Sequence, residues 1–284
     1  MTARIHLLGP LSAVTADGTA IRLGGPKPRT LLAALLLARD SVLPDTHLAR
    51  LLWAGTAPAT AEAQLYTYAS RLRKALAPHV RLRRHRPGYQ LRSEAHLDTD
   101  EFTRLVHQGH RLLAAGDPET ALRHADAALA LWRGPALADV AEPLRAAESP
   151  RFDELRMSAL ETRIEACLTL HPPARLLPEL TALVARHPMR ERFRAQLMVA
   201  LYRDQRQTEA LQVYHRGRAL LDDHVGVAPG PLLRQTYQHI LTGHILTGTA
   251  PDTTATGSPR RAAPGTAAAT AWPTGRPSSG ATRD

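Results

Sequence analysis

The sequence predicts a mainly α-helical protein with two globular parts, a small α+β part followed by a longer all-α part. Residues 1–97 combine short strand patterns with helical ones, whereas residues 98–246 are helical nearly throughout. The chain has 284 residues, of which 44% are hydrophobic and 22% charged. Since domains usually run to about 100–200 residues, this length and composition fit a globular chain with two cores.

Short strand patterns open the chain. Ile5 and Leu7 are two residues apart, as are Ile21 and Leu23, and Gly-Pro, Asp-Gly and Gly-Gly turn signals separate the segments. Apolar residues at a spacing of two, with turns between them, predict a small antiparallel sheet.

Three helical patterns and a hairpin complete the first part. Apolar residues at helical spacing predict helices over about residues 31–39, 45–53 and 58–76. The segment 80–91 carries apolar residues on both sides of a Pro-Gly turn, which predicts a β-hairpin. A sheet, three helices and a C-terminal hairpin, in this order, are typical of a winged helix, which is a helix-turn-helix variant.

The second part is predicted to be an array of helices. Segments 174–188 and 208–222 superpose at a shift of 34 residues, and a helix–turn–helix period of about 34 is the tetratricopeptide signature. The pattern therefore favours a tetratricopeptide-like array over an unrelated bundle. The predicted helices cover residues 102–114, 121–132, 154–170, 176–186, 191–203, 208–221 and 232–246.

The last segment, residues 247–284, consists mainly of Thr, Ala, Gly, Ser, Pro and Arg and is predicted to be a disordered tail. The longest apolar run, residues 31–38, is far shorter than the ~20 residues of a membrane span. The N-terminus lacks a basic region followed by an apolar stretch. We therefore expect a cytoplasmic protein with no membrane partner.

The net charge of +10 is concentrated in one part of the chain. Residues 1–97 hold 14 Lys and Arg against 5 Asp and Glu, whereas residues 98–246 hold 18 against 19. A basic first third joined to a neutral remainder predicts a polyanion-binding domain attached to a second domain. The predicted division is thus a DNA-binding domain at 1–97 and a helical domain at 98–246.

The third predicted helix has one face that suits nucleic acid. Its apolar stripe is the core side, and the opposite arc combines hydroxyls, a tyrosine and cations, which can read base edges and bind phosphates. The candidate residues of this helix are Tyr66, Thr67, Ser70, Arg71, Arg73 and Lys74.

The hairpin adds a cluster of cations beside its turn, in the part that a winged helix lays into the minor groove. With the third helix it gives two basic elements close together in the sequence. The candidate residues of the hairpin are Arg83, Arg84, His85, Arg86 and Tyr89.

A second class of function fits part of this pattern. Any solvated helix carries Lys and Arg, so the chain could be a tetratricopeptide-like adaptor whose basic domain serves RNA or is merely solvated. We expect no enzymatic activity, because the sequence contains no nucleophile turn, no phosphate-binding loop and no convincing pair of catalytic carboxylates. Cys167 is the only cysteine, and His107 and His110 lack further ligands, so we expect no metal and no cofactor.

Several stretches resemble a known family. LLGPLSAV, LGGPKPRTLLAALLL, LYTYASRLRKAL and RPGYQL are similar to the winged-helix domain, of the response-regulator type, in the Streptomyces antibiotic regulatory protein (SARP) family. Downstream, LDTDEF, LALWRGPALADV and GVAPGPLLR resemble the bacterial transcriptional activation domain of the same family. The resemblance covers residues 4 to about 242, and the two modules come in the family's order.

The resemblance implies an activator of secondary-metabolite (antibiotic) gene clusters. Such proteins bind direct repeats in double-stranded DNA near the promoter −35 element, commonly as a head-to-tail homodimer, and recruit RNA polymerase holoenzyme. The third helix departs from the family pattern, because Ala63 stands where Asn is usual and Tyr66 where Gln is usual. Loss of an amide that could pair with adenine should alter the target sequence.

Overall fold

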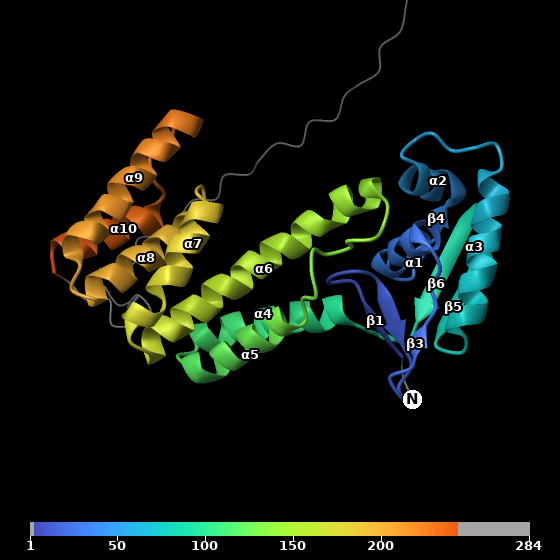
Figure 1. Ribbon diagram of the computed structural model, residues 1–284, viewed down its shortest axis with the longest axis horizontal. Coiled ribbons are helices and arrows are strands. Elements are labelled where there is room, and N and C mark those ends of the chain that lie inside the picture. The colour runs from blue at the N-terminus through green and yellow to red at the C-terminus, as the bar shows by residue number, and fades with distance from the viewer. Residues whose placement is uncertain (1–2, 244–284) are drawn as a thin grey trace, which may run out of the picture. The chain divides into compact units, whose positions relative to one another are not determined.

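Two small sheets and three helices form the first part of the chain, as the sequence predicts (Figure 1). The computed structural model describes residues 3–243, and the predicted tail at 247–284 lies outside them. The elements of this part are β1 (Arg4–His6), β2 (Ser12–Val14), β3 (Ala20–Ile21), α1 (Pro26–Leu37), β4 (Leu43–Pro44), α2 (Asp45–Trp53), α3 (Ala61–Leu76), β5 (Val80–His85), β6 (Gly88–Ser93) and β7 (His96–Leu97).

The N-terminal sheet has the strand order β3-β2-β1-β7. Its antiparallel strands β1 and β2 pair Ile5 with Ala13, and the parallel strand β7 pairs Leu97 with Ile5. Ile5 and Leu7 are both buried in the core, which explains their apolar spacing of two in the sequence. Strand β7 was not predicted, because two residues are too few to show a period.

The second sheet, in the order β4-β6-β5, is the predicted hairpin with a short strand added at its edge. Helix α3 packs against α1, α2 and β5, and its buried residues are the predicted stripe. The winged-helix prediction is therefore confirmed. The buried residues of α3 are Leu65, Ala69, Leu72 and Leu76.

The rest of the described chain is helical, also as predicted. Several boundaries differ from the prediction, and the largest difference is that the helix expected to begin at Glu154 begins at Glu142 and continues through Pro150. Pro143 occupies the first turn, where a proline costs no hydrogen bond and favours helix initiation. The elements are α4 (Asp98–Ala114), α5 (Pro118–Ala130), α6 (Glu142–Leu170), the short 3₁₀ helix η1 (Pro173–Arg175), α7 (Leu177–Arg186), α8 (Glu191–Arg203), α9 (Gln207–Val225) and α10 (Pro231–Leu241).

None of the helices within residues 3–243 combines the length and apolarity that crossing a membrane requires.

A buried carboxylate joins the N-terminal sheet to the helical part. Asp98, the first residue of α4, accepts hydrogen bonds from the backbone N–H groups of Leu7 (2.7 Å) and Leu8 (3.0 Å), which follow β1. Only 2% of its side chain is exposed, and it forms an ion pair with Arg133 at 3.7 Å. Burial raises the pKa of Asp98, although the two N–H groups and Arg133 oppose this rise.

The chain comes back to the winged helix between α5 and α6, in a segment of residues 131–141 that we call the return segment. The N–H of Arg133 donates to Leu8 O (2.8 Å), and the N–H of Leu137 donates to Leu7 O (2.9 Å). Leu137 and Val140 are buried in the same hydrophobic core as α1 and α3. The first core of the protein therefore includes residues from beyond position 97.

Asp139 holds the return segment from the side. It accepts a hydrogen bond from the N–H of Leu11 (2.7 Å), and its second oxygen forms an ion pair with Arg29 of α1. The N–H of Ala141 donates to the hydroxyl of Thr30, which is itself fully buried (2.8 Å). The sequence boundary at residue 97 is thus a packed junction in which α4 directly follows β7.

The Asp98→Ala variant should lower the free energy of unfolding by about 2–4 kcal/mol, because it leaves two buried N–H groups without an acceptor. Asp98→Asn should cost less, since its amide oxygen still accepts one of the two bonds. Urea unfolding followed by circular dichroism measures both. The control is Asp100→Ala, which removes an exposed ion pair with Arg39 from the same helical turn and should cost about 1 kcal/mol or less. Equal costs for Asp98→Ala and Asp100→Ala would contradict the role given to Asp98.

Candidate nucleic-acid interface

Helix α3 presents the predicted polar face to solvent. Tyr66 is 64% exposed, an unusual exposure for so large an aromatic side chain. Ser70, Arg71 and Lys74 are also exposed, and no ion pair engages either cation within the described residues 3–243. The hydroxyl of Thr67 donates to Ala63 O of its own helix (2.9 Å) but keeps its acceptor lone pairs.

Arg73 has a different position from the other cations of α3. Its Nε donates a hydrogen bond to the backbone carbonyl of Leu82 in β5 (2.9 Å). This bond ties the C-terminal part of α3 to the hairpin, while the residue as a whole stays exposed. Arg73 therefore fixes the angle between two elements of the candidate interface, and its terminal nitrogens remain available for a phosphate.

The hairpin divides its arginines between two faces. Side chains alternate along a strand, so Val80, Leu82 and Arg84 lie on one face of β5. Val80 and Leu82 are buried, which makes this the core face. Arg81, Arg83 and His85 lie on the opposite, solvent face, where Arg81 is directly across from Arg92 of β6.

Arg84 was predicted to enter the minor groove, but its guanidinium is engaged by a carboxylate of the protein itself. Its two terminal nitrogens donate to the two carboxylate oxygens of Asp45, at the start of α2 (2.5 and 2.6 Å). Glu62 lies 3.4 Å away, and the guanidinium sits over the ring of Tyr89 at 4.6 Å. The bonds to Asp45 raise the pKa of Arg84. This arginine fixes the hairpin to α2, as a positioning residue.

Tyr89 was predicted to contact DNA, but the structure buries its side chain and leaves almost none of it at the surface. Tyr89 is only 2% exposed and belongs to the hydrophobic core that includes Leu91. Its position opposite Arg84 places it on the core face of β6. Burial raises the pKa of the Tyr89 hydroxyl, which is consistent with a packing role.

The end of the hairpin lies close against β4. A Cβ atom at Gly88 would come within 1.8 Å of Leu43 O and 2.7 Å of Pro44 Cα, so no larger residue fits there without a shift of the backbone. The N–H of Asp45 donates to Pro87 O (3.1 Å). The turn is therefore fixed at both Gly88 and Arg84, and the exposed His85 and Arg86 are carried by a fixed support.

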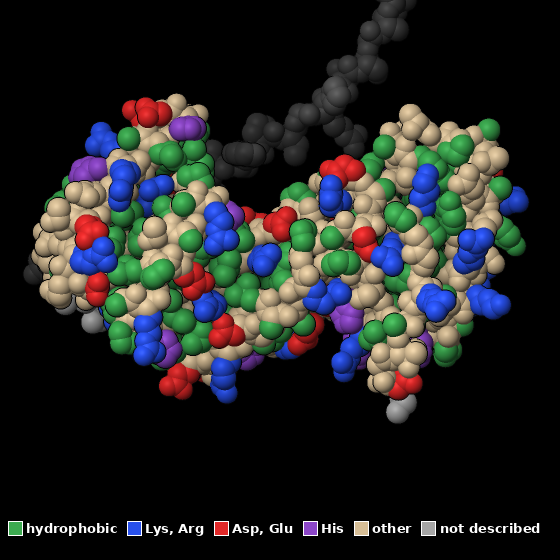
Figure 2. Space-filling model, viewed as in Figure 1, with side chains coloured by type: hydrophobic (Ala, Val, Ile, Leu, Met, Phe, Trp, Pro, Cys, Tyr) green, Lys and Arg blue, Asp and Glu red, His purple; other side chains and the backbone are tan. Residues whose placement is uncertain are grey.

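Arg92, which was not among the residues predicted from the sequence, completes the basic solvent face of the hairpin. Arg81 and Arg92 are like charges directly opposite each other, an arrangement that is destabilising without a counter-ion. Among residues 3–243 no carboxylate pairs with Arg81, Arg83 or Arg92. The alternation of core-facing and solvent-facing side chains along the hairpin strands is the sequence signal that would have indicated Arg92. Figure 2 shows Lys and Arg side chains over the region where Figure 1 draws α3 and the hairpin.

These features define the class of the protein. A winged helix whose third helix and hairpin expose unpaired cations, joined to an all-α domain, is the architecture of a winged-helix transcriptional regulator.

Comparisons with known proteins agree with this class. Residues 97–241 match the family model of the bacterial transcriptional activator domain. Regulatory protein AfsR of Streptomyces coelicolor is 42% identical to this chain. The match covers 84% of this chain but only 24% of the length of AfsR. Transcriptional regulator RedD of the same organism is 40% identical, and the match covers 84% of this chain and 70% of RedD. Regulatory protein DnrI of Streptomyces peucetius is 36% identical, and the match covers 84% of this chain and 92% of DnrI.

A solved structure is also similar, that of Mycobacterium tuberculosis EmbR in complex with a low-affinity phosphopeptide. It superposes with a TM-score of 0.75 at 34% identity and covers 85% of this chain and 65% of that one. The chain belongs to the SARP family of transcriptional regulators.

A double-mutant cycle should detect the bond between Arg84 and Asp45. We expect Arg84→Gln and Asp45→Asn each to destabilise the protein, with a coupling energy of about 1 kcal/mol, because the pair is bidentate and only partly exposed. Thermal or urea unfolding of the four proteins measures it. A second cycle on Arg83 and Asp45 is the control and should give none. A zero coupling for Arg84 and Asp45 would show that Arg84 is free in solution.

Proposed function

We propose that this protein is a sequence-specific DNA-binding activator in which residues 1–97 bind DNA and the helical part, residues 98–246, mediates activation. The observation that carries the proposal is the set of exposed, unpaired cations on α3 and on the solvent face of the hairpin. A protein keeps such a set at a cost in self-repulsion, which a polyanion relieves.

In this proposal α3 lies in the major groove. Arg71 and Thr67 are one turn apart on the exposed arc, so both reach base edges, and Arg71 can bind guanine through two hydrogen bonds. Tyr66 replaces the amide usual in the family with an aromatic ring, which favours contact with a thymine methyl group or a sugar over pairing with adenine. Ser70, Lys74 and Arg73 bind phosphates.

The hairpin lies along the backbone and the minor groove. Arg86 and His85 are exposed at the turn, and Arg81, Arg83 and Arg92 form a basic strip behind it. Cations at these positions add affinity for any duplex, because a narrow minor groove and phosphates attract charge with little regard to sequence.

The partners are proposed from family membership. They are direct repeats in double-stranded DNA near the −35 element, a second copy of the chain on the adjacent repeat, and RNA polymerase holoenzyme. The target genes are those of a secondary-metabolite (antibiotic) cluster. No catalytic step is assigned to the protein.

Genome-wide mapping of bound DNA would supply the site, and competition binding then tests the proposal. The mapped promoter fragment should compete with the labelled promoter far better than random duplex of the same length does. If random duplex competes equally well, the activator proposal is wrong, and the protein is better described as an adaptor whose first domain is merely basic.

Arg71 and Arg83 should affect binding in different ways. Arg71→Ala should cost about 1–3 kcal/mol on the cognate site and much less on scrambled DNA, because it removes a base contact. Arg83→Ala should weaken both duplexes alike and lower the slope of log K against log [salt] by about 0.9, because it removes a phosphate contact. The measurement is the affinity of each variant for cognate and for scrambled duplex at two salt concentrations, which distinguishes a base contact from a phosphate contact.

Arg123→Ala, which removes an exposed arginine of α5, is the control and should change neither affinity nor slope. If Arg71→Ala and Arg83→Ala lose the same affinity on both duplexes, α3 does not read bases through Arg71.

A further inference from the structure

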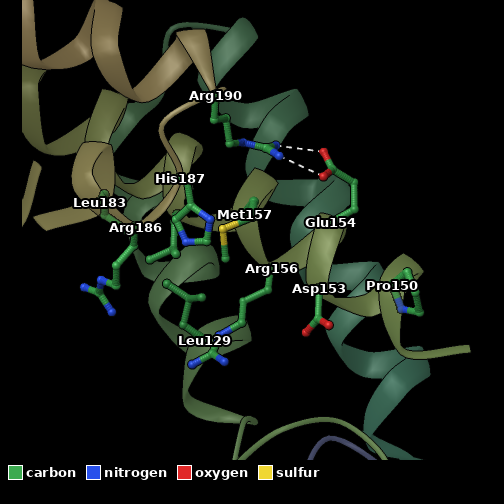
Figure 3. A pocket seen from close by; sticks show the side chains of 11 residues that line it. Leu129, Pro150, Asp153, Glu154, Arg156, Met157, Leu183, Arg186, His187 and Arg190 are labelled. Atoms are coloured by element: carbon green, nitrogen blue, oxygen red, sulfur yellow. Dashed lines mark hydrogen bonds and ion pairs between the residues drawn. The ribbon is translucent and has the colours of Figure 1, made fainter. Parts of the chain in front are cut away.

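A groove in the helical part lies away from the proposed DNA-binding surface. It has a volume of about 760 Å³ and is bordered by the end of α5, the middle of α6 and the end of α7. Figure 3 shows the side chains that line it. Its apolar lining consists of Leu129, Pro150, Met157, Leu160 and Leu183.

The periodicity of α6 builds one wall of the groove. Lining residues at positions 150, 153, 154, 157 and 160 recur at the three- and four-residue spacing of one helix face. Met157 and Leu160 remain only partly buried after the helical part has folded. An apolar wall that its own chain leaves incompletely covered has a surface available for an apolar occupant.

One pair of charges in the groove is already neutralised. Arg190 binds Glu154 through both terminal nitrogens (2.7 and 2.8 Å), as drawn in Figure 3, and its Nε bonds to Glu161. The bonds to the two carboxylates raise the pKa of Arg190. Arg190 therefore serves as a structural link between α6 and the start of α8.

The other charges in the groove have no such partners. Within residues 3–243 neither Arg156 nor Arg186 forms an ion pair, and Asp153 forms none. Two free cations against one free carboxylate leave an excess of one positive charge beside an apolar wall. This excess favours an occupant with a single negative charge.

Arg156 is held in a defined place. Its guanidinium lies over the ring of Trp132 at 4.4 Å, and Trp132 packs edge-on against the buried Phe102. Stacking leaves the in-plane N–H donors of an arginine free, and these donors match the geometry of a carboxylate. The side chain points into the groove in Figure 3, near Leu129.

We propose that this groove binds a small organic monoanion with an apolar body, such as a carboxylic acid with a hydrocarbon chain. Arg156 and Arg186 hold the carboxylate, and Met157, Leu160 and Leu183 contact the hydrocarbon. The volume lies within the ~300–1,000 Å³ of small-molecule sites. The site does not involve α3 or the hairpin, so it stands apart from the proposed DNA binding.

The probe is decanoate, and its chain-matched cation is decyltrimethylammonium. Calorimetric titration of the full chain should show one saturable decanoate site and at least tenfold weaker binding of the cation. Arg156→Gln and Arg186→Gln should each weaken decanoate about tenfold, the usual effect of losing one charge-assisted hydrogen bond. Asp153→Asn should tighten it.

Two comparisons distinguish binding in the groove from nonspecific binding of decanoate to the protein. Arg151→Gln removes an arginine of the same helix that also stacks on an aromatic ring, Phe152, but lies outside the groove, and it should leave decanoate affinity within twofold of the wild type. Arg186 is exposed at the end of α7, so its variant reports on the site even if Arg156→Gln unfolds the protein.

Absence of saturable decanoate binding overturns the proposal. Equal affinity for decanoate and the cation, or unchanged decanoate affinity in Arg186→Gln, overturns it as well.

Discussion

The buried carboxylate of Asp98 is the interaction on which the rest of the structure depends. It begins α4 and at the same time receives the backbone N–H groups of Leu7 and Leu8, where β1 ends. An aspartate in the first turn also interacts favourably with the helix dipole. Burial of an ionised group is unfavourable, and these N–H groups offset it by replacing the hydration that the carboxylate loses. One residue thus terminates the sheet, starts the helical part and sets the direction in which α4 leaves.

The return segment extends the same constraint. Its backbone bonds to Leu7 and Leu8 fall on the two residues whose N–H groups Asp98 engages, so sheet, α4 and return segment meet at one point. The helix that follows, α6, carries Leu144 in the winged-helix core and, further along, the wall of the groove at Met157. The basic first part and the neutral second part differ in charge and in secondary structure, but they share a core.

The sequence predicts helices better than it predicts which cations are free. On α3 a period of 3.6 separates buried from exposed positions, and the predicted core stripe is the observed one. In the hairpin the prediction counted cations near the turn without applying the period of two, so it placed Arg84 and Tyr89 on the DNA side. The partner of Arg84 is Asp45, which is 39 positions away and whose proximity depends on the packing of α2. Such pairings are tertiary facts, and no local pattern contains them.

The division between paired and unpaired arginines is the clearest functional signal in the structure. Arg84 and Arg190 each bond to a carboxylate through two nitrogens, and these arginines hold elements together. Arg71, Arg81 and Arg92 have no such partner within residues 3–243, although Arg81 and Arg92 face each other across the hairpin. Like charges at directly opposed positions oppose folding, and salt bridges would remove the penalty if stability were the only requirement. The unpaired set therefore fits a surface whose counter-ions come from outside the protein, and in the proposed function these counter-ions are the phosphates of a nucleic acid backbone.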